Sequence, residues 1–317
     1  MLLPRWALPI LLLILLLANG LAAAAAAEEK PLVVATTSVL GSVVEDLAGD
    51  QVQVIVLVNP SICPAHYDVK PSDLYAVSKA KLIFYHGIEE WLMQLYNASG
   101  SKARLVKVSG GWSTIDEAKS YYQQVAEALE SELGLDVSEK LGERLSELDR
   151  VAEEVLGEAE KESTSSINVI AMKWQRSFVE WLGFNVVGDF GPPERLSSSD
   201  IEKLISLGKE KNVAIVISNL QSGTDVGEVI AREIGAVHVV LSNFPGSSPE
   251  AKSLADLIEG NAEKVFKAIS LYQLKRTVME MRDEVEFYRV GFYALLVVAV
   301  VEAAGIAYLA RRLKAVG

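Results

Sequence analysis

The sequence is poor in the residues that form disulfides or bind soft metals, with one cysteine and three histidines in 317 residues. A single cysteine excludes an intrachain disulfide, so a lone thiol in an exported protein calls for a role. No glycine-rich loop that could hold a phosphate or an oxyanion accompanies it. Positive charge is also scarce, and the net charge is −12. Such a surface repels nucleic acid and anionic lipid headgroups, so we expect no nucleic-acid partner.

The cysteine lies in the segment 59–73, which also holds one of the histidines. Cys63 and His66 are three residues apart, and Pro60, Pro64 and Pro71 stiffen the segment. A thiolate and an imidazole held this close can bind one cation. The bland alternative is a proline-rich surface turn with an unrelated thiol, because Cys-x-x-His is a weak motif by itself.

Both ends of the chain are apolar. Residues 1–27 have a positive start at Arg5, an apolar run and several small residues, which predicts a signal peptide or, alternatively, an uncleaved anchor. Residues 290–310 carry one charge, Glu302, and are long enough to span a bilayer. The basic tail 311–317 is then expected in the cytoplasm. Glu302 is either a protonated residue that packs between helices or a contact to another membrane helix.

Between the ends, short β-rich runs alternate with helical ones, which predicts an α/β fold. Two similar lobes are expected, 31–136 and 163–260, each with a four-stranded, mainly parallel sheet. The first-lobe strands are predicted at 32–36, 51–58, 81–85 and 104–108, with a short helix at 89–95. Residues 137–162 carry one apolar stripe at helical spacing and no proline, which predicts a single long helix that links the lobes.

Residues 261–289 are predicted to form a charged juxtamembrane helix. Its apolar residues Leu271, Leu274, Val278, Met281, Val285 and Tyr288 follow 3-4 spacing. This pattern suits a short coiled coil or a helix that lies on the second lobe, and both interpretations remain open at this point.

Ligands in α/β lobes collect beyond the carboxyl ends of the parallel strands. Cys63 and His66 follow the second predicted strand and His86 follows the third, so all three are expected at one edge, as ligands of a divalent cation with zinc the first choice. In the second lobe, the residues at or just after strand ends are expected to face the same cleft: Met172, Lys173, Asn219, Gln221, Ser242 and Asn243. His238 lies inside a predicted strand and is interpreted as a structural histidine.

With these features the chain resembles a known family, the extracytoplasmic solute-binding proteins of zinc and manganese ABC importers. The resemblance covers roughly residues 31–260. It is carried by residues 33–38 at the first strand, Pro71-Ser72-Asp73-Leu74 after the turn, 80–85 with Glu90-Trp91-Leu92, and Trp181-Leu182-Gly183-Phe184.

The chain departs from the family pattern at the metal ligands. The family turn reads Asp-Pro-His, whereas this chain has Cys63-Pro64-Ala65-His66, with the histidine one place later. The remaining family ligand positions fall near Gly110, at Met172, and at Ser242 or Asn243. The hypothesis is therefore a rewritten site of Cys63, His66 and His86, completed by Met172 or water.

The resemblance implies a binding protein and no enzyme. It would hold its metal ion outside the cytoplasm, stay at the membrane through the C-terminal helix, and deliver the ion to an ABC permease with its ATPase. The alternatives are a binder of a larger metal chelate on the same fold, an enzyme with Cys63 as nucleophile, and a membrane-anchored adhesin that has lost solute binding.

Overall fold

The structure is a computed structural model that describes residues 30–316. Within this range the chain forms two compact units. The first takes in the described chain up to Asp149 together with Phe244–Leu254, and the second takes in Arg150–Asn243 and the chain from Ala255 onward. The predicted signal peptide lies outside the described residues.

The first unit contains a four-stranded sheet in the order β2-β1-β3-β4, and every pairing is parallel. Its strands are β1 (Leu32–Ala35), β2 (Gln53–Val56), β3 (Leu82–Tyr85) and β4 (Arg104–Lys107). Its helices are α2 (Ser38–Ala48), α3 (Pro71–Lys79), α4 (Leu92–Ser99) and α5 (Ile115–Leu133), with short 3-10 turns η1 (Gly49–Gln51) and η2 (Pro64–His66).

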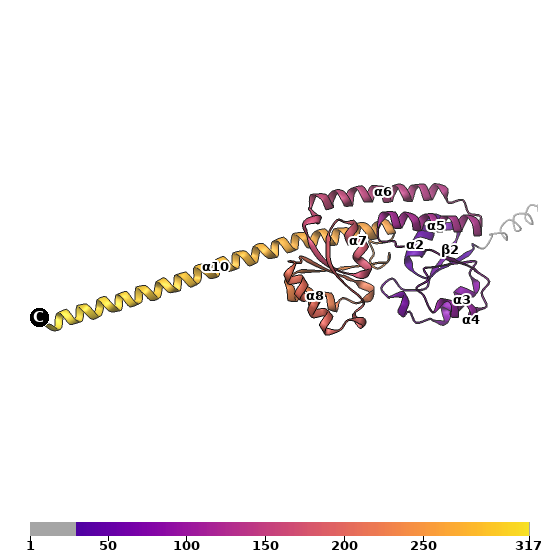
Figure 1. The fold of residues 1–317 in the computed structure, drawn as a ribbon. Coiled ribbons are helices and arrows are strands. Elements are labelled where there is room, and N and C mark those ends of the chain that lie inside the picture. Colours follow the sequence, from indigo (N-terminus) through magenta and orange to yellow (C-terminus); the bar gives the residue numbers. More distant parts are fainter. Residues whose placement is uncertain (1–29, 317) are drawn as a thin grey trace, which may run out of the picture. The chain divides into compact units, whose positions relative to one another are not determined.

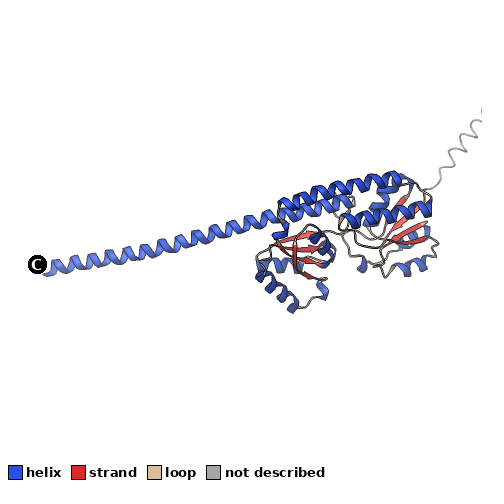
Figure 2. Cartoon of the chain, turned by 45° about the horizontal axis from the view of Figure 1, so that its top comes forward, coloured by secondary structure: helices blue, strands red, loops and turns tan. Residues whose placement is uncertain are grey.

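The second unit repeats this strand order without a visible sequence repeat. Its sheet runs β6-β5-β7-β8, again all parallel. The strands are β5 (Asn168–Met172), β6 (Asn185–Phe190), β7 (Ile215–Asn219) and β8 (Val237–Leu241). The helices are α7 (Arg176–Trp181), α8 (Ser198–Glu210) and α9 (Asp225–Ile234), with 3-10 turns η3 (Thr164–Ser166), η4 (Lys173–Gln175), η5 (Pro193–Arg195) and η6 (Leu220–Ser222). Figure 2 shows the strands of each unit flanked by helices. The predicted fold class is confirmed.

Two long helices complete the chain (Figure 1). The helix α6 (Ser138–Lys161) matches the predicted linking helix within one residue at each end. Its part up to Asp149 belongs to the first unit and the rest to the second. The helix α10 (Leu254–Val316) runs without interruption through the stretch predicted as a juxtamembrane helix followed by a membrane span.

The burial of α10 changes along its length. Residues such as Leu254, Ile258, Ala262, Val265 and Ile269 are buried, whereas the large apolar residues from Leu271 onward are exposed. The helix is long and apolar enough to cross a membrane, and its most apolar window has a mean hydropathy of 2.2. The helix therefore packs on the second unit as far as Ile269, and Lys275 Nζ still donates to the Ala236 carbonyl oxygen of that unit at 3.4 Å.

Local sequence explains where the helices start and stop. The helix α5 begins with a capping box, in which Thr114 Oγ1 accepts from the Glu117 backbone N–H and the Glu117 carboxylate accepts from the Thr114 backbone N–H. It ends at Gly134, whose φ of 68° is in the left-handed region that favours glycine. The strands are rich in Val, Ile and Leu and are buried on both faces in the middle of each sheet, as parallel sheets require.

Candidate functional site

The loops that follow the strands of the first unit bring together several polar side chains. Thr36 and Thr37 follow β1, the segment with Cys63 and His66 follows β2, and His86 follows β3 directly. The carboxyl ends of parallel strands meet at one edge of a sheet, which is the usual place for a ligand. The expectation that His86 lies at this edge therefore agrees with the strand order.

His86 is buried and both of its ring nitrogens have hydroxyl partners. Nε2 lies 2.6 Å from Thr37 Oγ1, and Nδ1 lies 2.8 Å from the hydroxyl of Tyr121. The Tyr121 hydroxyl donates to the carbonyl oxygen of Gly110 at 3.2 Å. Because that hydroxyl has only one proton, Tyr121 accepts from Nδ1–H, and Nε2 then accepts from Thr37. His86 is thus in the Nδ1–H tautomer, with its lone pair on Nε2.

Burial keeps His86 uncharged. Removal from water lowers its pKa to about 4, although the nearby Glu89 carboxylate acts in the opposite direction. Burial also raises the pKa of Tyr121, so its phenol stays protonated. A neutral imidazole is the form that binds metals, but here the metal would have to take the place of the Thr37 hydroxyl.

Glu89 fixes the loop that carries His86. Its carboxylate is buried and accepts from Thr36 Oγ1 at 2.5 Å, from the His86 backbone N–H at 3.1 Å and from the Gly87 backbone N–H at 2.7 Å. Such charge-assisted hydrogen bonds are about twice as strong as neutral ones. The sequence reasoning placed Glu89 at the start of a helix, whereas the helix α4 begins at Leu92, because the Glu89 side chain holds the preceding loop instead.

An aromatic cluster covers His86. The ring of Trp112 lies 4.7 Å from the His86 ring and 6.0 Å from Phe244, on which it is stacked. Trp112 also contacts Tyr121 at 5.6 Å. Gly110, which precedes this tryptophan, has a φ of 103° and no side chain to offer a ligand. At this position the structure supplies aromatic surface in place of a metal-binding side chain.

The turn with Cys63 and His66 is held by its neighbours. Pro64 is buried, and its carbonyl oxygen accepts from Trp91 Nε1–H at 2.8 Å. The ring of Tyr67 packs on Trp91 at 5.1 Å, and its hydroxyl donates to Asp73 Oδ2 at 2.9 Å. These contacts fix the backbone while the side chains that carry the predicted chemistry stay accessible.

Cys63 is half-buried and its thiol is free, and His66 is exposed. The His66 backbone N–H donates to the Cys63 carbonyl oxygen at 3.0 Å, so Cys63 caps η2 and His66 is its last residue. Across residues 30–316, no group of three or more His, Cys, Asp or Glu side chains is placed to hold a metal ion. The structure therefore brings Cys63 and His66 into one turn but does not join His86 to them in a ready ligand set.

The corresponding edge of the second unit carries a neutral network of amides and hydroxyls. Gln221 is its centre, because its Nε2 donates to Ser242 Oγ at 2.8 Å and its Oε1 accepts from Asn219 Nδ2 at 3.1 Å and from the Asn243 backbone N–H at 3.2 Å. Gln175 Nε2 donates to Asn243 Oδ1 at 2.7 Å. The predicted contacts Asn219, Ser242 and Asn243 do gather here, bonded to one another through Gln221.

Met172 has a different environment. It is fully buried and belongs to the apolar core of the second unit, together with Ile170, Phe190 and Val216. Its sulfur is surrounded by hydrocarbon and is not presented to solvent. His238 is the structural histidine that the sequence suggested, with Nε2 at 2.8 Å from Ser218 Oγ and a pKa lowered by burial.

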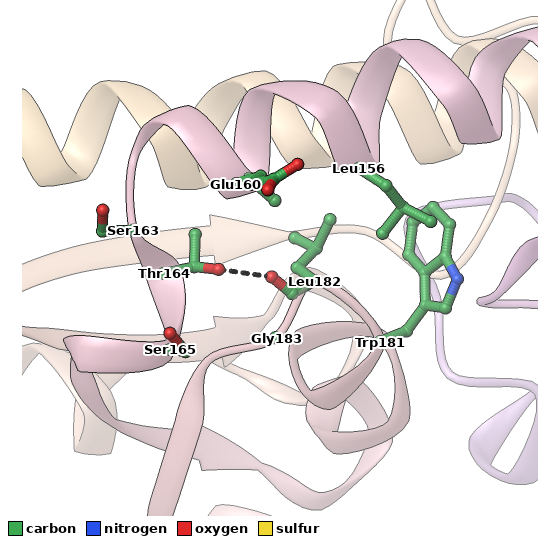
Figure 3. Close-up of a pocket in the computed structure, with 9 residues that line it drawn as sticks. Leu156, Glu160, Ser163, Thr164, Ser165, Trp181, Leu182 and Gly183 are labelled. Atoms are coloured by element: carbon green, nitrogen blue, oxygen red, sulfur yellow. Dashed lines mark hydrogen bonds between the residues drawn. The ribbon is translucent and has the colours of Figure 1, made fainter.

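The second unit also has a hollow of about 310 Å³ (Figure 3), lined in part by the residues that precede the amino ends of β5 and β6. It is lined by residues of α6, η3 and the end of α7, among them Leu156, Glu160 and Trp181. Thr164 Oγ1 donates to the Leu182 carbonyl oxygen at 2.7 Å across its floor. Glu160 is the one charged side chain among the lining residues, so the hollow offers no set of metal ligands.

Sequence reasoning missed several residues of the first-unit edge. Glu89 is only three positions after His86, so its hydrogen bonds to this loop could have been predicted from the sequence. Thr37 and Tyr121 contact His86 although they lie 49 and 35 positions from it in the sequence. Phe244, which contacts Trp112, follows β8, the last strand of the chain's second sheet. No local pattern in the sequence announces contacts at such separations.

Comparison with known proteins shows which family has this architecture. A family model described as ZnuA, zinc-uptake complex component A, periplasmic, matches residues 33–268. The manganese-binding lipoprotein MntA of Halalkalibacterium halodurans is 25% identical over 278 aligned residues, which cover 75% of this chain and 88% of the relative.

Solved structures have the same fold. The periplasmic zinc-binding protein TroA of Treponema pallidum superposes with a TM-score of 0.67 at 17% identity, over 76% of this chain and 99% of that one. A manganese-bound periplasmic metal-binding protein from Candidatus Liberibacter asiaticus gives a TM-score of 0.62 at 18% identity, over 76% of this chain and all of that one.

The family match spans both sheets and includes the turn with Cys63 and His66. It confirms the resemblance inferred from the sequence and the expectation of a solute-binding protein that is no enzyme. The chain belongs to the family of periplasmic components A of zinc-uptake complexes.

Proposed function

We propose that this protein captures a divalent metal ion, zinc first, outside the cytoplasm and delivers it to an ABC permease powered by an ATPase. The observation that carries the proposal is the family match over residues 33–268, which contains a turn where a thiol and an imidazole lie three residues apart at the ligand edge of a parallel sheet. Relatives named as manganese-binding and zinc-binding proteins support a divalent cation as cargo.

The donor types favour zinc over manganese. Cys63 offers a soft sulfur and His66 an imidazole, whereas manganese prefers carboxylate, carbonyl and water oxygens. The turn is rigid and both side chains are accessible, so they can meet an ion without refolding the backbone. We propose Cys63 and His66 as the primary ligands, with water in the open positions.

His86 is proposed as the third ligand. Its Nε2 lone pair now accepts from Thr37, while Nδ1–H is held by Tyr121, the arrangement that orients a metal-binding histidine from behind. Because His86 is already neutral, binding would release no proton from it. Metal loading would exchange one hydrogen bond for one coordinate bond, together with a local movement of the loops.

The C-terminal helix is proposed as the membrane anchor. Residues 290–310 would be about 32 Å long at 1.5 Å per residue, which matches the hydrocarbon core of a bilayer. An anchored receptor would stay close to its permease and so meet it at a high effective concentration.

A second candidate is a receptor for a larger metal chelate. It is favoured by the absence of a ready three-ligand cluster among residues 30–316 and by the half-buried Trp112, whose ring lies 4.7 Å from the His86 ring at the edge of the first unit. Aromatic faces and amides bind an organic chelator, whereas a bare ion needs charged or soft ligands.

Calorimetric titration of the full-length protein in lipid nanodiscs with ZnCl₂ and MnCl₂ tests the proposal. We expect one zinc site per chain, with zinc bound more tightly than manganese. Cys63→Ser and His66→Ala should each weaken zinc at least about tenfold. His238→Gln is the matched control, since it removes a histidine outside the site. Zinc affinity that is the same in the wild type and the first two variants would overturn the proposed ligands, and absence of metal binding would favour the chelate receptor.

A further inference from the structure

The exposed part of α10 carries a stripe of heptad repeats in which every a and d position except Glu302 is apolar. Counting Leu271 as position a, the a and d positions continue to Leu309 over 39 residues, about 58 Å of helix. The a positions are Leu271, Val278, Val285, Phe292, Ala299 and Ile306, and the d positions are Leu274, Met281, Tyr288, Leu295, Glu302 and Leu309. A sustained a/d repeat is the pattern of a coiled coil.

The described part of the chain leaves this stripe uncovered. The six a and d residues from Leu271 to Tyr288 are between 51% and 65% exposed, although they precede the membrane span and therefore face water. The other faces of this segment carry charges that pair within the helix, such as Arg276 with Glu280 at 3.3 Å. An apolar stripe of this length in water favours a helical partner.

The charged residues at the e and g positions favour a second copy of the helix in parallel orientation. The three e positions before the membrane span are all basic: Lys275, Arg282 and Arg289. An antiparallel pair would set these side chains against one another. In a parallel pair the g residue meets the next e residue of the partner, so Glu284 faces Arg289 of a second copy. Glu284 forms no ion pair among the described residues, whereas Arg289 pairs with Glu286 of its own helix at 2.5 Å, so pairing of two copies would add Glu284 as a second carboxylate partner of Arg289.

The choice of core residues favours two strands. Valine occupies the a positions 278 and 285, and leucine and methionine occupy the d positions 274 and 281. A β-branched residue at a with an unbranched one at d is the arrangement that favours parallel dimers over trimers.

The same stripe enters the membrane span and includes its one charged residue. Glu302 lies two heptads after Tyr288, at a d position, next to Ala299 and Ala303. A carboxyl group is costly in hydrocarbon unless it is protonated and hydrogen-bonded. Two copies in parallel register would bring the two Glu302 carboxyl groups together, and the small neighbours would let the helices approach closely.

We propose that α10 pairs in parallel with α10 of a second copy of this chain, through the a and d residues from Leu271 to Leu309, and that the protein is a membrane-anchored dimer. The contact between Glu284 and the partner's Arg289 sets the register in water, and the Glu302 pair continues it within the membrane. This inference rests on the helix and is independent of which solute the protein binds.

Disulfide cross-linking of the full-length chain in membranes tests the pairing. Cys63→Ser provides a cysteine-free background, and single cysteines are then placed by Val278→Cys and Met281→Cys on the stripe, or by Arg276→Cys and Asp283→Cys on the opposite face. With diamide as oxidant, we expect chains of doubled mass at 278 and 281 and several-fold fewer at 276 and 283. Equal cross-linking at all four positions, monomers throughout, or cross-links only to a protein of different mass would overturn the proposal.

Charge exchange then tests the register. In the Val278→Cys chain, Glu284→Arg and Arg289→Glu should each lower the yield of doubled chain, because each sets like charges against one another across the pair. The double exchange Glu284→Arg with Arg289→Glu should restore it. If the double variant cross-links no better than the single ones, the g-to-e′ contact and the parallel register are wrong.

Discussion

At the scale of single residues, His86 shows how burial and hydrogen bonding decide the chemistry of the first-unit edge. Its two ring nitrogens are satisfied by Thr37 and Tyr121, and its ring is covered by Trp112. These contacts suit the neutral imidazole, and protonation at Nε2 would require Thr37 to turn its hydroxyl from donor to acceptor. His86 is therefore both a structural residue of the first unit and a preorganised candidate ligand.

The lowered pKa of His86 predicts a pH dependence of stability. The pKa falls from 6.5 in the unfolded chain to about 4 in the fold. Between these values the unfolded state binds the proton and the folded state does not, so stability is full above pH 6.5 and falls as the pH drops towards 4. Protonation of His86 in the unfolded chain should lower the free energy of unfolding by at most about 3 kcal/mol.

Urea unfolding of the metal-free protein at pH 7.5 and pH 5, compared between wild type and His86→Gln, measures this contribution. The wild type should lose more stability on acidification than the variant. Imidazole NMR signals give an independent check, since the signal that disappears in His86→Gln should stay in its neutral position down to pH 5. A wild-type His86 signal that titrates near pH 6.5 would contradict the account.

Glu89 supports a second prediction at this scale. Replacing its carboxylate by an amide in Glu89→Gln sets an N–H₂ group against donors from Thr36, His86 and Gly87. We expect a loss of about 1–3 kcal/mol. The exposed neighbour Glu90 provides the control, and Glu90→Gln should change the unfolding free energy by less than about 0.5 kcal/mol. Equal effects of the two substitutions in urea titrations would disprove the anchoring role.

Single residues also show how much of the candidate site could be predicted from the sequence. The positions of Cys63, His66 and His86 after their strands followed from strand and turn patterns, because parallel strands end at a common edge. The state of His86 did not follow, because Thr37, Tyr121 and Trp112 come from three other elements. Local patterns place a residue on an edge, but they do not report which distant side chains occupy its hydrogen-bonding groups.

At the scale of elements, two glycines in helices provide a matched pair. A Cβ at Gly41 of α2 would overlap the side chain of Val56 on β2, whereas a Cβ at Gly142 of α6 would meet nothing within 4 Å. Gly41→Ala should therefore destabilise the protein by about 1–3 kcal/mol through overpacking. Gly142→Ala should stabilise it by about 0.5–1 kcal/mol, because alanine loses less backbone entropy in a helix.

Urea titrations of the two variants beside the wild type check this pair. Opposite signs support the close packing of α2 on the sheet. A stabilising Gly41→Ala would mean that α2 is not held against β2 at this distance.

The elements themselves were largely predictable. The strands matched because short runs of β-branched residues end at turn residues, and α6 matched because its apolar stripe has no break. The main difference lies at α10, which was expected to begin at residue 261 and to run directly into the apolar span, and which begins at Leu254. Neither proline nor a capping sequence interrupts it, so the helical backbone hydrogen bonds continue from the body into the apolar span.

At the scale of the whole molecule, the proposed anchor predicts where the protein is found. A chain that stops after Arg289 lacks the apolar span and should be released from membranes by a carbonate wash. A chain that stops after Arg312 keeps the span and should remain with them. Immunoblots of the washed membrane and soluble fractions measure both. Retention of the shorter chain would show that the span is not what holds the protein.

The central claim is that Cys63 and His66 bind the transported metal in place of the family's usual ligands. X-ray absorption at the zinc edge, on the full-length protein loaded with one zinc per chain, tests it most directly because it detects sulfur in the coordination shell. We predict one sulfur at about 2.3 Å with nitrogen or oxygen ligands at about 2.0–2.1 Å, and loss of the sulfur shell in Cys63→Ser. A shell of nitrogen and oxygen alone in the wild type would contradict the claim.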